Sequence, residues 1–384
     1  MYPVSQAYKD AIMQPSRQFR GRLLIPKLTM NFTRNSIAYK QDGTQVAANQ
    51  PRFEQGRFGK AIMVEEGTTN LISNPSFEND FTSWGNWGTP PTREIVTSPV
   101  WHDSKALHLI TNANNQGVYQ ILSLTAGITY TVSCWVYVVT GNPVLMVERV
   151  NDGQVSYPVV IADSSWAGDG KWHRLQLTFT AGNTSNRIHL GKSASGNIGE
   201  YYFDAIQLEQ KPYATSFIDG TRADETLTIP TTGVFPDINN FTIELWAKAQ
   251  TIKTDTYQGI FGGRGILGAP PVDLLIATNN QLYLFYYNST GANTPLATGY
   301  YISDRTNWHY YAVTFCNGTV RIYVDGIKVK EANITLAQTT GNGNFYIGRS
   351  IVATQYWNGL IDDLRISNRA KSDEEILAAY MEVA

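Results

Sequence analysis

The sequence predicts an all-β protein built from two β-sandwich domains in tandem after a small N-terminal segment. Short runs rich in Val, Ile, Tyr and Phe alternate with Thr, Asn and Gly along most of the 384 residues. This pattern is typical of strands joined by turns, and helix signals are confined to the two ends. A motif of three parts also occurs twice in the same order. The length alone is enough for two or three domains.

The repeated motif divides the chain into an N-terminal segment (1–67), a middle domain (68–216) and a C-terminal domain (217–384). YTVSCWVYV (130–138), KWHRLQLTF (171–179) and FDAIQL (203–208) are answered by FTIELWAKA (241–249), NWHYYAVTF (307–315) and IDDLRI (361–366). The gaps differ between the two copies, which excludes a tandem solenoid and favours two similar sandwiches. SFIDGTRADET is the expected link between the domains.

The two ends of the chain carry the helix signals. A short helix is expected between a cap at Ser5 and a stop at Pro15, followed by a strand in RGRLLIPKLTMNFTR. At the other end, Ser372 and Glu375 form a capping box before the last helix. Residues 1–64 carry ten Lys or Arg against three Asp or Glu, a net +7. This excess predicts a basic arm that docks on another protein or on nucleic acid, or else a solvated basic surface.

Strand alternation predicts which side chains of the middle domain face the core. Alternate residues of a strand point to opposite faces of its sheet. Tyr130, Val132, Cys134, Val136 and Val138 form one apolar face and therefore point inward. By the same rule, the residues expected to point inward from the next two strands are His173, Leu175, Leu177, Phe179, Ile188 and Leu190.

The opposite faces of these strands carry an unusual set of aromatic and planar polar side chains. The set consists of Trp135, Tyr137, Trp172, Arg174, Gln176, Arg187 and His189. Sugars present apolar CH faces and many hydroxyls, so aromatic platforms with planar donors and acceptors suit them. These seven residues are the predicted ligand-binding set. The alternative is that another domain or another copy of the protein covers them.

Five blocks of the middle domain resemble carbohydrate-binding module families 4 and 9. They are NLISNPSFENDFTSWG, SKALHL, GVYQILSLTAGITYTVSCWVYV, KWHRLQLTFTAG and YYFDAIQLEQ, in order over 70–212. The resemblance implies a jelly-roll sandwich with a structural Ca²⁺, a cation that prefers oxygen ligands. Mapped onto this chain, the ligands would be the Glu78 and Asp204 carboxylates with backbone oxygens near Asn74 and Lys105. It also implies that Trp84 packs internally, and it leaves Trp87 and Trp101 as loop candidates.

The C-terminal domain resembles the concanavalin-like laminin G superfamily, another group of jelly rolls. The resemblance rests on FTIELWAKAQT, NWHYYAVTFCNGTVRIYVDGIKV, NFYIGRS and WNGLIDDLRISNRAKSDEEI, over about 220–380. Members bind glycans, proteins or nothing, so the fold assigns no activity. We expect Asp325 in a hairpin turn, and Asp362, Asp363 and Arg365 in a structural network. The exposed aromatic candidates for a ligand are Tyr257, Tyr286, Tyr301 and Trp357.

The sequence argues against an enzyme. No Glu-x-Asp-x-Glu pattern of jelly-roll glycosidases occurs, and Glu244 stands alone on the outer face of its strand. The five His have no metal-ligand spacing, and His173 and His309 fall on core-facing positions. Cys134 and Cys316 are expected to be buried free thiols. The N-terminus lacks a signal-peptide pattern, and no apolar run is long enough to cross a bilayer.

The N-terminal block, which contains YPVSQAYKDAIMQPSRQFRGRLLIPKLT, resembles the starts of bacteriophage tail and baseplate-associated structural proteins. That resemblance implies a non-enzymatic virion adhesion protein, made in the host cytoplasm and acting outside it. Its partners would be cell-surface polysaccharide and, through the N-terminal segment, other virion proteins. We expect no nucleic-acid binding, no membrane insertion, and a homo-oligomer or many copies per particle. The alternatives are a purely structural virion component and a tail depolymerase or glycosidase fragment.

Overall fold

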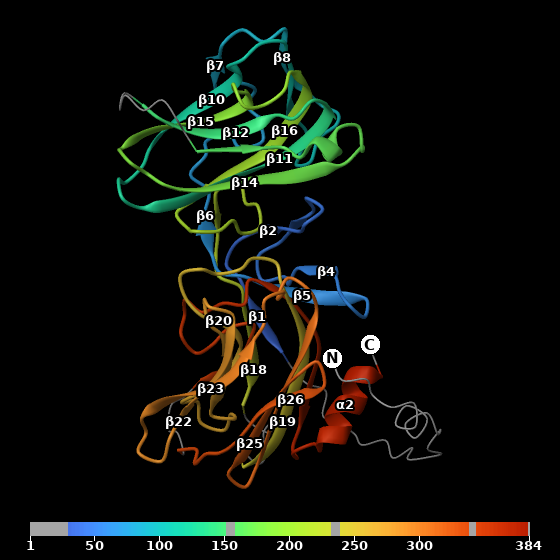
Figure 1. Cartoon of the computed structure of the whole chain (residues 1–384), viewed down its shortest axis with the longest axis vertical. Helices are drawn as coiled ribbons and strands as arrows, with labels where there is room; N and C mark the ends of the chain where they lie inside the picture. Colours follow the sequence, from blue (N-terminus) through green and yellow to red (C-terminus); the bar gives the residue numbers. More distant parts are fainter. Residues whose placement is uncertain (1–29, 151–157, 232–238, 338–342, 383–384) are drawn as a thin grey trace.

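A computed structural model of the chain describes residues 30–150, 158–231, 239–337 and 343–382. Two β-sandwiches lie end to end, the middle domain above the C-terminal domain in Figure 1. Within the described residues there is a single α-helix, α2 (Asp373–Met381), near the C-terminus. The all-β tandem-sandwich architecture expected from the sequence is confirmed. The helix expected between Ser5 and Pro15 lies outside the described residues.

The middle domain consists of two five-stranded antiparallel sheets. The first sheet has the order β13 (Val159–Ile161), β12 (Val144–Arg149), β15 (Ser185–Lys192), β10 (Gln116–Ser123) and β7 (Gly85–Trp87). The second has the order β14 (Trp172–Thr180), β11 (Thr129–Thr140), β16 (Gly199–Glu209), β9 (Ala106–Thr111) and β8 (Thr92–Val96). A short 3-10 turn, η1 (Ser164–Trp166), precedes β14.

The core of the middle domain lies between these sheets and follows the predicted alternation. All five inward residues of β11 are buried in it, as are Leu175, Ile188 and Leu190. Trp84 is also buried, and its indole N–H donates to the Asn74 carbonyl at 3.0 Å. Its expected packing role is confirmed. His173 differs, because it lies at the end of β14 with its ring stacked 4.4 Å from Trp166, and it is only half-buried.

The C-terminal domain consists of two seven-stranded sheets. One has the order β1 (Asn31–Thr33), β18 (Thr226–Pro230), β27 (Asn344–Ile347), β20 (Gln258–Gly262), β21 (Val272–Ile276), β22 (Gln281–Tyr287) and β23 (Asn293–Tyr301). The other has the order β26 (Ile327–Asn333), β25 (Thr319–Val324), β24 (His309–Cys316), β19 (Asn240–Ala249), β28 (Gly359–Ser367), β5 (Lys60–Val64) and β4 (Phe53–Gln55).

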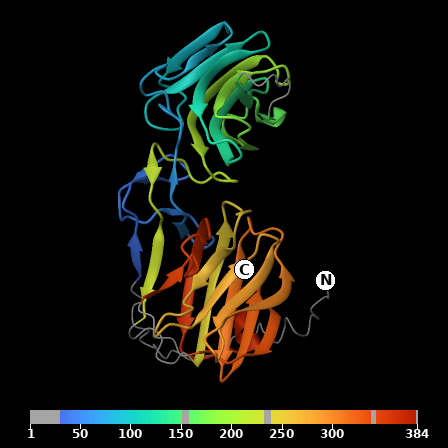
Figure 2. The same cartoon turned by 90° about the vertical axis from the view of Figure 1, so that its left-hand side faces the viewer.

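The N-terminal segment therefore contributes strands to the C-terminal domain. β1 pairs with β18, while β5 pairs with β28 and carries β4 at the sheet edge. Figure 2 shows this segment beside the strand that leads from the middle domain into the C-terminal domain. We placed a domain boundary at residue 67, but the described residues before it do not form a separate unit. Residues 31–33 and 53–64 complete the two sheets of the C-terminal domain.

Helix α2 covers the outer face of the β19 and β24 strands. Trp246, Tyr310 and Ile376 share one buried cluster there, and the Tyr380 ring stacks 5.5 Å from Trp246. Ser372 caps the helix in the expected capping box with Glu375. The Asp325–Gly326 turn joins β25 to β26 with positive φ at both residues, 51° and 76°, which confirms the predicted hairpin.

The two domains meet at a buried network of charged side chains. Two small pairs of strands lie at this junction, β6 (Thr68–Thr69) with β17 (Thr221–Arg222), and β2 (Ala38–Tyr39) with β3 (Gln45–Val46). The ion network consists of Arg34, Arg52, Glu65, Arg222 and Glu225, all with side chains exposed by 1 % or less. Glu225 accepts from Arg34 at 2.7 Å and from Arg52 at 2.5 Å.

This junction corrects the interpretation of the N-terminal charge. Arg34 and Arg52 point into the protein and are neutralised there, so neither contributes to a basic docking surface. Arg57 lies 4.0 Å over the Trp246 ring but stays exposed, as does Lys60. Five of the ten basic residues counted in 1–64 precede residue 30 and lie outside the described residues.

Candidate functional site

The structure divides the seven predicted ligand-binding residues between two opposite faces of the middle domain. Trp135, Tyr137, Trp172, Arg174 and Gln176 lie on β11 and β14, on the outer face of one sheet. Arg187 and His189 lie on β15, which belongs to the other sheet. Since the two sheets of a sandwich expose opposite faces, these groups cannot line one common surface. Each face is therefore a separate candidate site.

The first candidate is the outer face of β7, β10, β15 and β12, which we call the aromatic face. It consists of Trp87, Tyr119, Glu148, Arg187 and His189. The His189 ring lies 4.5 Å from Trp87 and 5.7 Å from Tyr119 between ring centroids. The Arg187 guanidinium lies 5.0 Å from the Tyr119 ring and 3.3 Å from the Glu148 carboxylate.

The polar groups of the aromatic face are held in a fixed arrangement. Glu148 contacts His189 Nε2 at 2.8 Å, while His189 Nδ1 is buried without a hydrogen-bond partner. Burial lowers the pKa of His189, although the hydrogen bond and the charge of Glu148 oppose this. The neutral imidazole this favours has one nitrogen to donate and one to accept a hydrogen bond. His189 itself is only 3% exposed, so the face presents rings beside a carboxylate and a guanidinium, with the imidazole packed beneath them.

Local sequence explains how this face is built. Val118 and Leu122 point into the core from β10, which places Tyr119 on the opposite side of the strand. Gly85 lies directly across from it, and a Cβ there would be 2.7 Å from the Tyr119 ring. Gly117 has φ of 152°, and a Cβ there would be 1.9 Å from the Leu190 carbonyl oxygen. Glycine is needed at both positions for the ring and the neighbouring strand to approach this closely.

Tyr119 and Glu148 of this set were not among the residues predicted from the sequence. Tyr119 could have been found, because the alternation in GVYQILS points it outward by the rule applied to β11. The local sequence does not indicate that Trp87 lies beside His189, since this contact depends on the pairing of β7 with β10.

The second candidate is the outer face of β11 and β14, most of which is occupied by other parts of the chain. The Trp135 ring stacks on Trp101 at 4.4 Å and 14° and belongs to a cluster with Phe217. Trp172 packs edge-on against Tyr137 at 5.8 Å, and both stay half-buried. The indoles lie outside the core layer, as the alternation predicts, but the platform proposed at Trp135 is covered by its neighbours.

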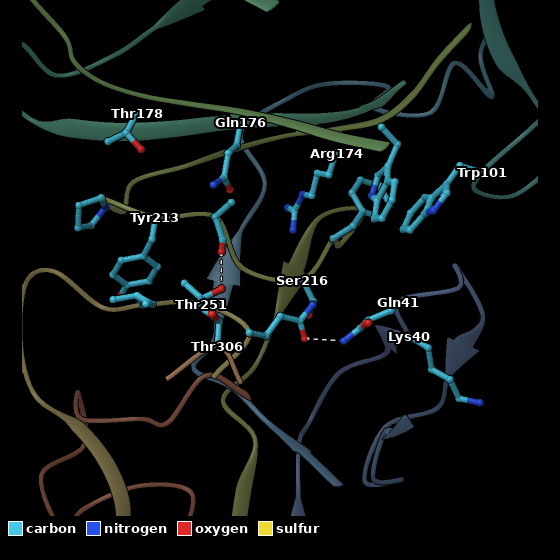
Figure 3. A pocket seen from close by; sticks show the side chains of 16 residues that line it. Lys40, Gln41, Trp101, Arg174, Gln176, Thr178, Tyr213, Ser216, Thr251 and Thr306 are labelled. Atoms are coloured by element: carbon cyan, nitrogen blue, oxygen red, sulfur yellow. Dashed lines mark hydrogen bonds between the residues drawn. The ribbon is translucent and has the colours of Figure 1, made fainter. Parts of the chain in front are cut away.

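A cleft remains between this face and the C-terminal domain, and we call it the interdomain cleft. Its volume is about 490 Å³, and Figure 3 shows its side chains. Arg174, Gln176 and Thr178 point into it from β14. Residues of the C-terminal domain, among them Thr251 and Thr306, lie on the opposite side. Gln41 bonds to Gln250 at 2.9 Å across one edge of the cleft.

The residues implied as calcium ligands lie around one loop, 101–105, of the middle domain. The Glu78 carboxylate accepts hydrogen bonds from the backbone N–H groups of Ser104 and Lys105 at 2.9 and 2.8 Å. Asp204 accepts from the N–H groups of Trp101 and His102, both at 2.8 Å. Burial raises the pKa of Asp204 to about 7 against these hydrogen bonds.

This arrangement does not fit a calcium shell as it stands. The Glu78 carbonyl oxygen accepts from the Lys105 ammonium at 3.0 Å, and the Asn74 carbonyl accepts from an indole N–H. Among the described residues, no group of three or more His, Cys, Asp or Glu is placed to hold a metal. A Ca²⁺ ion would have to displace these donors, so the contacts present do not fit the calcium site that the resemblance implies.

The C-terminal domain places its candidates differently from the expectation. Trp357 is completely buried in the core, which corrects its assignment as an exposed ligand contact. Tyr257 and Tyr286 are half-buried, and Tyr301 is exposed. Asp363 pairs with Arg365 at 2.8 Å, and Asp362 accepts from the Phe58 N–H, as expected of a structural network.

One further expectation for this domain, the exposure of Glu244, is corrected, whereas His309 keeps the core-facing position predicted for it. Glu244 is buried under α2 and not exposed, since it accepts a hydrogen bond from Tyr310 at 2.6 Å and bonds to the Lys371 ammonium. His309 is half-buried and contacts Asp325 at 2.7 Å and Asp304 at 3.1 Å. Burial lowers the pKa of His309, but the hydrogen bond and charge of Asp325 outweigh it, and the pKa is raised.

Comparisons with known proteins agree with this division into two sandwiches. Residues 69–190 match the family model of a carbohydrate binding domain, and residues 219–377 match the concanavalin A-like lectin/glucanases superfamily. Each match covers less than half of the chain. No curated protein matches the chain. No helix in the described part of the chain is both long and apolar enough to cross a membrane.

Several solved structures match parts of the chain. The binding domain of botulinum neurotoxin serotype D is 16% identical, with 41% of this chain and 40% of that chain covered, at a TM-score of 0.31. The CBM22-1 xylan-binding domain from Paenibacillus barcinonensis Xyn10C is 18% identical, with coverages of 38% and 96% and a TM-score of 0.31. The tandem CBM22-1-CBM22-2 domain of the same protein is 13% identical, with coverages of 80% and 100% and a TM-score of 0.31.

These likenesses carry no statement about function. The match with the neurotoxin domain spans less than half of that domain's length. The family models are more specific. By them, the middle domain is similar to carbohydrate binding domains, and the C-terminal domain is similar to concanavalin A-like lectins and glucanases.

Proposed function

We propose that this chain is a non-enzymatic glycan-binding protein of a phage tail, which attaches the virion to cell-surface polysaccharide. The aromatic face of the middle domain carries the proposal. Trp87 and Tyr119 supply flat rings for the CH faces of a sugar. Arg187 and Glu148 supply planar donors and acceptors for its hydroxyl groups, and the buried His189 holds Glu148 in place. The match of residues 69–190 to a carbohydrate binding domain supports the same ligand class.

Several observations support binding without catalysis. The isolated carboxylate on β19, Glu244, is buried beneath α2 and bonded to Tyr310 and Lys371, where no polysaccharide can reach it. On the aromatic face, Glu148 is paired with His189 and Arg187. Glycosidases of most families need two carboxyl groups flanking one bond.

Attachment to other virion proteins is proposed for the N-terminal segment, through residues other than Arg34 and Arg52, which are internal. A particle with many copies would multiply the weak affinity of each site for a repetitive polysaccharide. Immunogold microscopy of the phage that encodes this chain tests the location. Labelling of the tail is expected, and particles without the protein would refute the virion assignment while leaving glycan binding untouched.

Glycan binding is tested with the full chain on a panel of immobilised cell-surface polysaccharides. Tyr119→Ala is expected to weaken binding about tenfold, because one stacking ring is lost. Phe53→Ala, which removes an exposed aromatic ring from the C-terminal domain, is the matched control. Binding that is unchanged in Tyr119→Ala would refute a site on the aromatic face.

One observation favours a second candidate, a purely structural virion component. Trp101 and Phe217 cover the Trp135 ring, as expected if the outward aromatics serve protein contacts. This candidate predicts that the full chain binds no polysaccharide of the panel.

A further inference from the structure

The interdomain cleft lies on the side of the middle domain opposite to the aromatic face, and the proposed function does not use it. Its walls come from the N-terminal segment, from β14, from the link at 212–217 and from 250–252 of the C-terminal domain. Each family model includes only part of these walls, residues 69–190 with β14 and residues 219–377 with 250–252, while the N-terminal segment and 212–217 lie outside both. A site here would exist only in the chain that contains both domains. Its volume of about 490 Å³ lies within the roughly 300–1,000 Å³ of small-molecule sites.

The charge of the cleft is unbalanced. Arg174 points into it, and none of the residues that line it is an Asp or Glu. Arg174 Nη2 donates to Ser133 Oγ at 2.8 Å and to the Thr215 carbonyl at 2.7 Å, which fixes the guanidinium. Its Nε is buried and without a hydrogen-bond partner. Among the described residues, Arg174 forms no ion pair.

Several other arginines of the described chain are paired with carboxylates. Arg187 on the aromatic face is paired with Glu148, and Arg34, Arg52 and Arg222 at the junction are paired with Glu65 or Glu225. Burial lowers the pKa of Arg174, and the charges of Glu209 and Glu65, neither of which forms an ion pair with it, oppose this. Because both hydrogens of Nη2 are used, Nη1 is the nitrogen left to donate a charge-assisted hydrogen bond to a carboxylate supplied by a ligand.

The remaining walls suit a sugar ring. Trp101 and Trp135 form one side, and the buried Trp135 Nε1 is a donor without a partner. Gln176 and Thr178 on β14 are exposed and face Thr251 across the cleft. Amide and hydroxyl groups that both donate and accept can match the mixed hydrogen bonding of sugar hydroxyls.

We propose that the interdomain cleft binds a uronic acid residue of an acidic polysaccharide, with Arg174 holding the sugar carboxylate beside the Trp101–Trp135 wall. This second site is independent of glycan binding on the aromatic face. The proposed site differs from a site for neutral sugars because its ligand must carry a negative charge. It differs from a site within either sandwich because both domains contribute to its walls.

The test compares acidic oligosaccharides with their own methyl esters, using the full chain in calorimetric titrations. The probes are oligomers of galacturonate, glucuronate and mannuronate. The methyl esters keep the sugar ring but remove the negative charge. We expect at least one uronate oligomer to bind, and its methyl ester to bind at least tenfold more weakly. If no uronate binds, or if ester and acid bind equally, the proposal is wrong.

Variants locate the binding in the cleft. Arg174→Gln is expected to weaken uronate binding at least tenfold, whereas Arg321→Gln, which removes a half-buried arginine of the C-terminal domain far from the cleft lining, is the matched control. Arg174 also anchors two strands, so Gln176→Ala and Thr178→Ala, which truncate exposed side chains, are measured beside it and should each weaken binding severalfold. Uronate binding that is lost in Tyr119→Ala but kept in all three cleft variants would place it on the aromatic face and overturn the proposal.

Discussion

Replacing Glu65 by Gln tests the role of the buried ion network at the junction. The Glu65 carboxylate contacts Arg52 at 2.9 Å and Arg222 at 3.1 Å, and it accepts from the Ser216 N–H at 2.8 Å. Glutamine keeps the size of the side chain but removes the charge. Two guanidinium groups would then lose a carboxylate partner away from water, where an unpaired charge is most costly.

The pKa of Glu65 sets the magnitude. Burial alone would raise this pKa, but the charges of Arg222 and Arg52 and the hydrogen bonds to the carboxylate outweigh it and lower the pKa from 4.5 to about 2. At 1.36 kcal/mol for each pH unit, this corresponds to about 3 kcal/mol. The value agrees with the 3–5 kcal/mol expected when one partner of a buried pair is removed.

The same pKa fixes how the effect depends on pH. A carboxylate with a lowered pKa stabilises the folded state fully above its unfolded pKa, here 4.5, and loses that contribution as the pH falls toward 2. Urea unfolding of both proteins at pH 7, 4.5 and 3 measures the difference. We expect the free energy of unfolding to differ by about 3 kcal/mol at pH 7, and by clearly less at pH 3.

The matched control is Glu331→Gln, which breaks an exposed pair with Lys328 and Arg321 and should change the unfolding curve little. The reasoning fails if Glu65→Gln unfolds at the urea concentration of the wild type. It also fails if the difference is as large at pH 3 as at pH 7.

Three further predictions address the middle domain. Gly117→Ala should lower the melting temperature and weaken polysaccharide binding, because the added Cβ would be 1.9 Å from the Leu190 carbonyl oxygen. Gly127→Ala, also at positive φ but with no atom within 4 Å of the added Cβ, should have a far smaller effect, and equal effects of the two variants would contradict the close-approach argument. Burial raises the pKa of the Cys134 thiol, so a thiol reagent at pH 8 should label the half-buried Cys316 first and Cys134 only after unfolding. Labelling of Cys134 in the folded protein before Cys316 would contradict this prediction. A chelator should leave the melting temperature of the middle domain unchanged, since hydrogen-bond donors already occupy the Glu78 and Asp204 oxygens. A melting temperature that falls in chelator and recovers when calcium is added would instead support the calcium site that the resemblance implies.

Strand alternation made the local part of the site predictable. The period of two residues fixes which side chains of β11, β14 and β15 leave the core, and these strands follow it except at His173, which is half-buried. Alternation contains no information on which strands share a sheet. Arg187 and Trp172 are only fifteen residues apart in the sequence, yet β15 pairs with β10 and β12 while β14 pairs with β11. The single predicted set therefore separated into two faces.

Charge counting failed for a related reason. Arg34 and Arg52 pair with Glu225, which lies 191 and 173 residues away in the sequence. A local excess of positive charge indicates an exposed basic arm only if its partners are also local. Trp357 shows the same limit, because the alternation of a short segment cannot reveal that two seven-stranded sheets close over it.

The buried ion network lies next to the interdomain cleft. Glu66, next to Glu65, bonds to Lys253 of the C-terminal domain at 2.9 Å and to the hydroxyl of Tyr213, which lines the cleft. These buried contacts, and not the exposed Gln41–Gln250 bond, hold the cleft walls at their separation. A ligand that enters such a preformed site loses less affinity to ordering the protein. Glu65→Gln should for this reason weaken uronate binding in the cleft more than polysaccharide binding on the aromatic face, whose strands all belong to one sheet. Equal loss at both sites would show that the junction does not shape the cleft.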